Sequence, residues 1–258
     1  MPDSIISVFH AFRQEIDHHN DRRERLIKSS RDVTSLSKKI IFLLHRMLNE
    51  PCASSSERDR ALKAAEASRK KLTEVQQLIS GMKLDLQGDL YWRYQPQVSP
   101  GLQEYIEALS FTHYLEHGTL ITLDQVQETL RDSEGGSLFP LPVGDYILGL
   151  ADLTGELMRY AITTVSQPGG RARANELCTF VRECKADFER LAPHVRDLHK
   201  KNRVTAQSLQ KIEDAMYAIA VRSAEFDLPQ SMMDALVANI YSANKPGYSS
   251  YEEDVTMA

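Results

Sequence analysis

Apolar residues recur at helical spacing along the first part of the chain. From Ser4 to Asn49 no proline or glycine occurs, and apolar residues such as Leu36 and Ile40 return every three or four positions. This pattern predicts one long helix. Pro51 interrupts it, and a second, highly charged helix is predicted from Glu57 to about Leu86.

Further helical segments follow, separated by glycines and prolines. A short helix is predicted after Thr122, because the spacing from Thr122 to Gln125 is that of a capping box. Asp145 is predicted as the N-cap of the next helix, which ends before Pro168. The remaining helices are expected over Gly101 to Glu116, Ala174 to Leu191 and Ala206 to Ser223.

No alternating strand pattern and no internal repeat are present. The sequence therefore predicts an all-α fold, a single-domain bundle of about seven helices. We expect this domain to span residues 1–243, with residues 244–258 forming a mobile acidic C-terminal tail.

The segment from Tyr91 to Tyr94 contains three aromatic residues and one arginine. We expect it to start helical and to become irregular by Gln95, since the residue before a proline is disfavoured in a helix. Tyr91, Trp92, Arg93 and Tyr94 combine flat rings with a guanidinium, which suits contact with single-stranded RNA. The alternative, favoured for aromatics at this spacing, is packing in the core.

Charge, cysteine content and hydropathy argue against some classes of protein. The net charge of −5 argues against a protein that coats nucleic acid by bulk electrostatics. Three cysteines without metal-ligand spacing suit a reducing compartment, and no apolar run is long enough for a membrane span. We therefore expect a cytoplasmic or nuclear location and no membrane partner.

Carboxylates interrupt two otherwise apolar helices. In the helix after Asp145, apolar residues occupy most of the circumference, and the remaining narrow stripe holds Asp145, Gly149, Asp152, Glu156 and Arg159. The helix from Gly101 places two more acids three residues apart among apolar neighbours. These acids are Glu104 and Glu107.

Buried carboxylates are costly unless they are paired or bind a cation. Their hard oxygen atoms suit Mg²⁺, with Mn²⁺ as an alternative, so Glu104, Glu107, Asp152 and Glu156 are a candidate metal site. The alternative without a metal is that these carboxylates form ion pairs with Arg159, Arg93 or lysines of neighbouring helices. A ferritin-like di-iron site is disfavoured, because neither helix carries a Glu-x-x-His motif. Basic residues of the first helix, Lys38 among them, are interpreted mainly as a solvated face, and His45 as a structural or surface residue.

Three blocks of sequence resemble the translin-associated factor X branch of the translin family. They are ERLIKSSRDVTSLSKKIIFLLHR (Glu24 to Arg46), GLQEYIEALSF (Gly101 to Phe111) and PVGDYILGLADLTGELMR (Pro142 to Arg159). The resemblance implies a translin-like helical fold, an obligate hetero-oligomer with a translin subunit, and Mg²⁺-dependent endoribonuclease activity on single-stranded RNA.

The family's catalytic acids fall on Glu104, Glu107, Asp152 and Glu156, the same residues that the helical pattern selects. Asp145 is a candidate extra acid near this site. As a hypothesis, Glu107 accepts a proton from the attacking water. The alternative function is a non-catalytic scaffold that stabilises translin and contributes to single-stranded nucleic-acid binding.

Overall fold

The computed structural model describes residues 5–50, 56–132, 134–167, 169–225, 231–232 and 235. Within these residues the elements are α1 (Ile5–Leu48), α2 (Glu57–Gly81), the 3-10 helix η1 (Lys83–Leu86), α3 (Leu90–His117), α4 (Leu123–Thr129), α5 (Val143–Val165), α6 (Gly170–Leu191) and α7 (Leu198–Glu225). An isolated bridge between Arg131 and Ser137 is the sole β pairing of the described part. The predicted all-α class is confirmed, whereas the expected tail at 244–258 lies outside the described residues.

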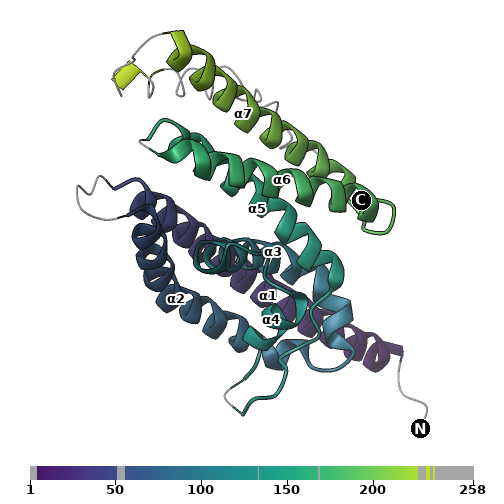
Figure 1. Ribbon diagram of the computed structural model, residues 1–258. Helices are drawn as coiled ribbons and strands as arrows, with labels where there is room; N and C mark the ends of the chain where they lie inside the picture. Colours follow the sequence, from purple (N-terminus) through teal and green to yellow (C-terminus); the bar gives the residue numbers. More distant parts are fainter. Residues whose placement is uncertain are drawn as a thin grey trace.

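The helices form two groups whose largest contact is between α3 and α5 (Figure 1). Helices α1, α2 and α3 pack on one another, and α5, α6 and α7 form the second group. The packing of α3 against α5 joins the two groups, and side chains of α1 and α7 add contacts between them. Helix α3 is consequently well enclosed, and every residue from Tyr105 to Leu115 is buried.

The two ends of α1 have different environments. Its C-terminal half buries residues such as Leu26, Val33 and Ile40, which recur seven positions or about two helical turns apart, against α2 and α3. Residues 5–18 are all exposed, although they include several large apolar side chains. None of the described helices is long and apolar enough to cross a membrane.

The prediction that the backbone becomes irregular by Gln95, before Pro100, is wrong. Helix α3 begins at Leu90 and continues through Pro96 and Pro100. A proline inside a helix removes a backbone donor and disturbs the hydrogen bonds around it. Here α1 supplies replacements, because the Ser30 hydroxyl accepts a hydrogen bond from the Gly101 N–H (3.1 Å) and donates one to the carbonyl of Val98 (3.4 Å).

The start of α5 also differs from the prediction. Pro142 occupies the N-cap position, so Asp145 lies inside the first turn rather than capping the helix. The buried Asp145 carboxylate instead accepts hydrogen bonds from three side chains of α3, Gln95 (2.8 Å), Ser99 (2.5 Å) and Gln103 (2.8 Å). At α4, by contrast, the predicted capping box of Thr122 and Gln125 is confirmed.

Gly149 sets how closely α5 approaches α3. A Cβ atom added at this position would lie 2.7 Å from Ile106 Cγ2 and 2.9 Å from the Gln103 carbonyl oxygen. Both distances are shorter than van der Waals contact, and one of the two atoms belongs to the backbone. The glycine is therefore required by the helix contact itself.

Gly149→Ala should destabilise the protein by about 1 to 3 kcal/mol, since the added methyl group forces α3 and α5 apart. Gly155→Ala is the matched control on the same helix, because a Cβ atom there meets nothing within 4 Å. That control should be neutral or stabilise by up to about 1 kcal/mol through helix propensity. Urea unfolding followed by circular dichroism measures both, and equal stabilities for the two variants would contradict the close contact.

Candidate functional site

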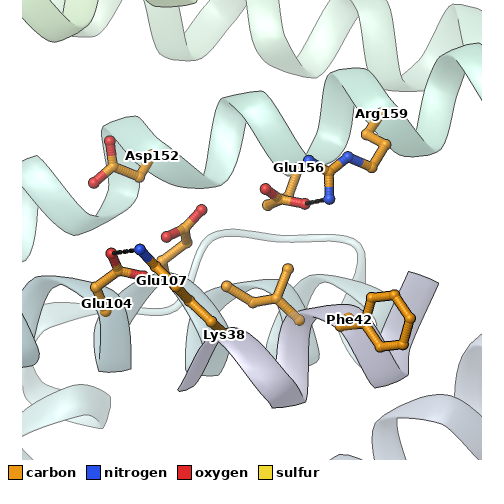
Figure 2. A pocket seen from close by; sticks show the side chains of 8 residues that line it. Lys38, Phe42, Glu104, Glu107, Asp152, Glu156 and Arg159 are labelled. Atoms are coloured by element: carbon orange, nitrogen blue, oxygen red, sulfur yellow. Dashed lines mark ion pairs between the residues drawn. The ribbon is translucent and has the colours of Figure 1, made fainter. Parts of the chain in front are cut away.

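A cavity of about 550 Å³ lies where α1, α3 and α5 meet (Figure 2). Its lining residues are Lys38, Ile41, Phe42, Glu104, Glu107, Asp152, Glu156 and Arg159. The four acids selected from the sequence are thus brought together in one cavity.

Each pair of acids shares a helix face because of its spacing. Glu104 and Glu107 lie three residues apart on α3, and Asp152 and Glu156 lie four apart on α5, so each pair points to one side. The α3–α5 contact at Gly149 then turns the two faces toward each other. The result is a wall of carboxylates from two helices.

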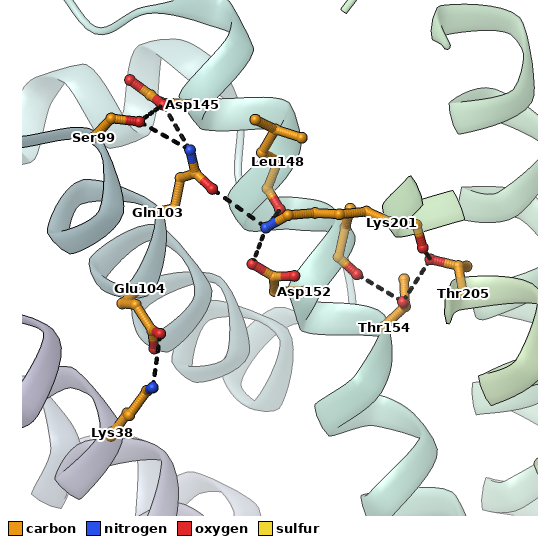
Figure 3. Close-up of polar contacts among 11 residues, drawn as sticks. Lys38, Ser99, Gln103, Glu104, Asp145, Leu148, Asp152, Thr154, Lys201 and Thr205 are labelled. Carbon is orange, nitrogen blue, oxygen red and sulfur yellow. Dashed lines mark hydrogen bonds and ion pairs between the residues drawn. The ribbon is translucent and has the colours of Figure 1, made fainter. Parts of the chain in front are cut away.

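Two of the acids form ion pairs with lysines from other helices (Figure 3). Lys38 of α1 contacts Glu104 with its Nζ 3.0 Å from Oε1, and Lys201 of α7 contacts Asp152. Lys201 also lies 3.3 Å from Oε1 of Gln103. Burial raises the pKa of Asp152, and the neighbouring Lys201 opposes that increase.

Glu156 has two basic neighbours. Nε2 of the buried His45 lies 2.5 Å from Glu156 Oε2, and the Arg159 guanidinium lies 3.2 Å from the same oxygen. The His45 ring is held in place by Phe111, with the ring centroids 5.0 Å apart. One oxygen of Glu156 is therefore fixed by α1 and by its own helix.

Glu107 differs from the other three acids. Its residue is 9% exposed, and within the described part of the chain its side chain forms no hydrogen bond and no ion pair. Burial raises its pKa to about 9, and the three neighbouring carboxylates contribute to that increase. The carboxyl group at the centre of the cavity is therefore neutral at pH 7 unless a cation compensates its charge.

The donor set matches a divalent cation in its chemistry. Four carboxylates offer hard oxygen ligands of the kind that Mg²⁺ and Mn²⁺ prefer. Across the residues that the structure describes, however, no group of three or more acidic, histidine or cysteine side chains converges at ligand distance. The ion pairs explain this, because they turn three of the acids toward basic side chains, and cation binding would require these carboxylates to turn toward one point.

Asp145, the candidate extra acid, does not line this cavity. It is linked to the cavity indirectly, because Gln103 donates to Asp145 while the oxygen of the same amide faces Lys201, the partner of Asp152 (Figure 3). Asp145 therefore supports the position of Gln103 and does not add a fifth carboxylate.

The four residues predicted to contact RNA separate into two pairs. Tyr91 is buried and stacks on Phe139 with the ring centroids 4.9 Å apart, and Tyr94 is buried beside His19, to which its hydroxyl is hydrogen-bonded. Trp92 is 63% exposed, and Arg93 is exposed as well. The packing alternative therefore describes the two tyrosines, and only Trp92 and Arg93 are accessible to a ligand.

Sequence reasoning missed two residues of the cavity lining and two partners of its acids. They are Lys38 and Phe42 in the lining, His45 beside Glu156 and Lys201 beside Asp152. The first three lie on one face of α1, at four- and three-residue spacing, and that spacing was the available signal. Nothing in the sequence indicates that this face meets α3 and α5. Lys201 carries no local signal at all, since it reaches Asp152 from α7.

Glu107→Gln should stabilise the metal-free protein. The Glu107 pKa of about 9 in the fold, against an ordinary value of 4.5, means that stability is complete below pH 4.5 and is lost as pH rises toward 9. A neutral amide removes this loss, which is on the order of 3 kcal/mol at pH 7. Thermal unfolding in chelator between pH 5 and 9 measures it, with the exposed Glu66→Gln as control. An unchanged pH dependence in Glu107→Gln would contradict the raised pKa of Glu107.

Comparison with known proteins places the chain in a family. The Translin family profile matches residues 21–223. The chain is 34% identical over 274 residues to Translin-associated protein X from Mus musculus, covering 98% of this chain and 88% of the mouse protein. It is 28% identical over 227 residues to the Translin-associated protein X homolog from Schizosaccharomyces pombe, covering 84% and 89% of the two chains.

Solved structures show the same fold at low sequence identity. The crystal structure of AfC3PO aligns with a TM-score of 0.62 at 19% identity, covering 83% of this chain and 97% of the other. AfC3PO in complex with duplex RNA gives a TM-score of 0.63 at the same coverage. On the extent of the profile match and on its identity to the mouse relative, this chain belongs to the translin family.

Proposed function

We propose that this chain is the catalytic subunit of a hetero-oligomer with translin, and that it is a Mg²⁺-dependent endoribonuclease of single-stranded RNA. The main observation in support is the cavity in which four acids come together from two helices, Glu104, Glu107, Asp152 and Glu156. A structural role alone does not account for Glu107, since a buried carboxyl group without a partner destabilises the fold. A protein of the same fold, AfC3PO, has been solved in complex with duplex RNA.

The exposed start of α1 supports assembly with a partner chain. Ile5, Phe9, Phe12 and Ile16 are all more than half exposed and follow each other at spacings of four and three residues. This is the spacing of a stripe that packs against another helix. A translin subunit, itself a relative of this chain, is the proposed partner.

The four carboxylates would hold the cation. When bound, Mg²⁺ would make a coordinated water more acidic and offset the negative charge that develops on the phosphate oxygens. In the proposed reaction, water attacks phosphorus, the bond to the leaving ribose oxygen breaks, and that oxygen takes up a proton. With its charge offset by a bound cation, Glu107 would be ionised and would receive the proton of the water, because among the described residues no basic side chain forms an ion pair with it.

The basic residues around the cavity position the acids. Lys38 holds one oxygen of Glu104, and Lys201 holds one oxygen of Asp152. These lysines also reduce the net negative charge, so that an anionic RNA strand is repelled less strongly.

The ion pairs favour a second candidate function, a non-catalytic scaffold. Three of the four acids already have basic partners, and this arrangement can exist without a cation. A scaffold would assemble with translin and bind RNA with no dependence on Mg²⁺.

Cleavage of a labelled single-stranded RNA by the assembly with translin separates the two functions. Asp152→Asn and Glu107→Gln should each lower the cleavage rate by about 100-fold or more, because each removes a charged ligand of the cation. Chelator should have the same effect, and the exposed Glu66→Gln should have none. Sedimentation must show unchanged assembly for every variant. Cleavage that survives both substitutions, or that never appears with Mg²⁺ or Mn²⁺, would favour the scaffold.

A further inference from the structure

An exposed aromatic ring lies on the wall of the carboxylate cavity. Phe42 lines the cavity and is 68% exposed, whereas the adjacent Ile41, which also lines it, is 6% exposed and belongs to the core. Single exposed apolar residues are common on protein surfaces and need no explanation by themselves. The position of Phe42, beside four carboxylates, is what distinguishes it.

The cavity has two chemically different ends (Figure 2). Glu104 and Asp152 lie at one end, and Phe42 and Arg159 lie at the other, with Glu156 between them. On α5 the step from Asp152 to Arg159 is seven residues, or about 10 Å along the helix axis. Phe42 and Arg159 are therefore displaced along the cavity from Glu104 and Asp152, whereas Glu156 lies beside Arg159 (Figure 2).

Arg159 completes the second end. Its side chain is 46% exposed, and its NH1 group is paired with Glu156 at 3.2 Å. A guanidinium has five N–H donors in a fork that matches phosphate oxygens. One ion pair with a carboxylate leaves donors for a second anion.

We propose that Phe42 and Arg159 form a nucleotide subsite next to the carboxylates, in which one unpaired base of the RNA stacks on the Phe42 ring and a neighbouring phosphate contacts Arg159. This subsite rests on the proposed function, whose catalytic step it does not perform. Stacking on an aromatic ring is tolerant of base identity, so the subsite accepts any of the bases. A base inside a duplex is already stacked and cannot reach the ring, and the subsite thereby selects single strands.

The first test measures RNA binding by fluorescence anisotropy, using the assembly with translin and an RNA too short to form a duplex. Phe42→Leu keeps an apolar side chain and removes the ring, and it should weaken binding by about tenfold or more. Phe42→Trp should bind at least as tightly as the wild type. Tyr217→Leu, which removes an exposed aromatic of α7 outside the cavity lining, is the matched control and should have no effect.

RNAs with one abasic ribose locate the stacked base. When the missing base is the one that stacks on Phe42, the abasic RNA should bind the wild type and Phe42→Leu with the same low affinity. The stacking contact needs both the base and the ring, so the loss of one leaves nothing for the loss of the other to remove. Arg159→Ala should lower the dependence of log Kd on log salt by about 0.7, as expected for the loss of one phosphate contact on a single strand. If Phe42 had only a structural role, no single abasic position would show this equality. If Arg159 had only a structural role, the salt dependence of Kd would not change.

Several results would overturn the subsite. The subsite is wrong if Phe42→Leu binds RNA as tightly as the wild type. It is also wrong if Phe42→Leu lowers the affinity by the same factor for every abasic RNA. A smaller sedimenting assembly in Phe42→Leu would instead identify the ring as a contact between subunits. These outcomes are distinct from failure of the proposed function: RNA that binds through Phe42 but is never cut removes the catalytic role and leaves the subsite in place.

Discussion

The close contact between α3 and α5 at Gly149 is the constraint on which the site depends. Each helix carries two acids on one face, and only their approach turns four separate surface charges into a shared cavity. A side chain at position 149 would meet the backbone of Gln103, one residue before Glu104. The spacing between the acid pairs is therefore set by backbone packing, which is stiffer than any arrangement of flexible carboxylate side chains.

The charges around the cavity are balanced by residues from the whole bundle. Basic side chains from α1, α5 and α7 engage three of the acids, and Glu107 is the buried one that forms no ion pair with a described residue. Such a group lowers the stability of the fold at neutral pH, which is expected at a binding site and not in a core selected for stability. Phe42 and Arg159, the latter paired with Glu156, are exposed to solvent at one end of the cavity (Figure 2).

Helical periodicity was a good guide wherever local sequence decides the structure. It predicted α1, the capping box of α4, and the pairing of acids on the faces of α3 and α5. It failed at the start of α3, where Pro96 and Pro100 indicate an irregular backbone. There the hydroxyl of Ser30 on another helix supplies hydrogen bonds that the prolines disrupt, and no local pattern contains that information.

The sequence by itself determined that the protein is helical, which acids share a helix face, and which family it resembles. Those properties depend on residues a few positions apart, and helix geometry converts such spacing directly into direction. The tertiary structure alone decided that Lys38, Phe42 and His45 face the acids, that Lys201 reaches Asp152, and that Asp145 binds α3 instead of capping α5. These contacts join residues far apart in the chain, and their formation depends on how whole helices pack, which no single helix encodes.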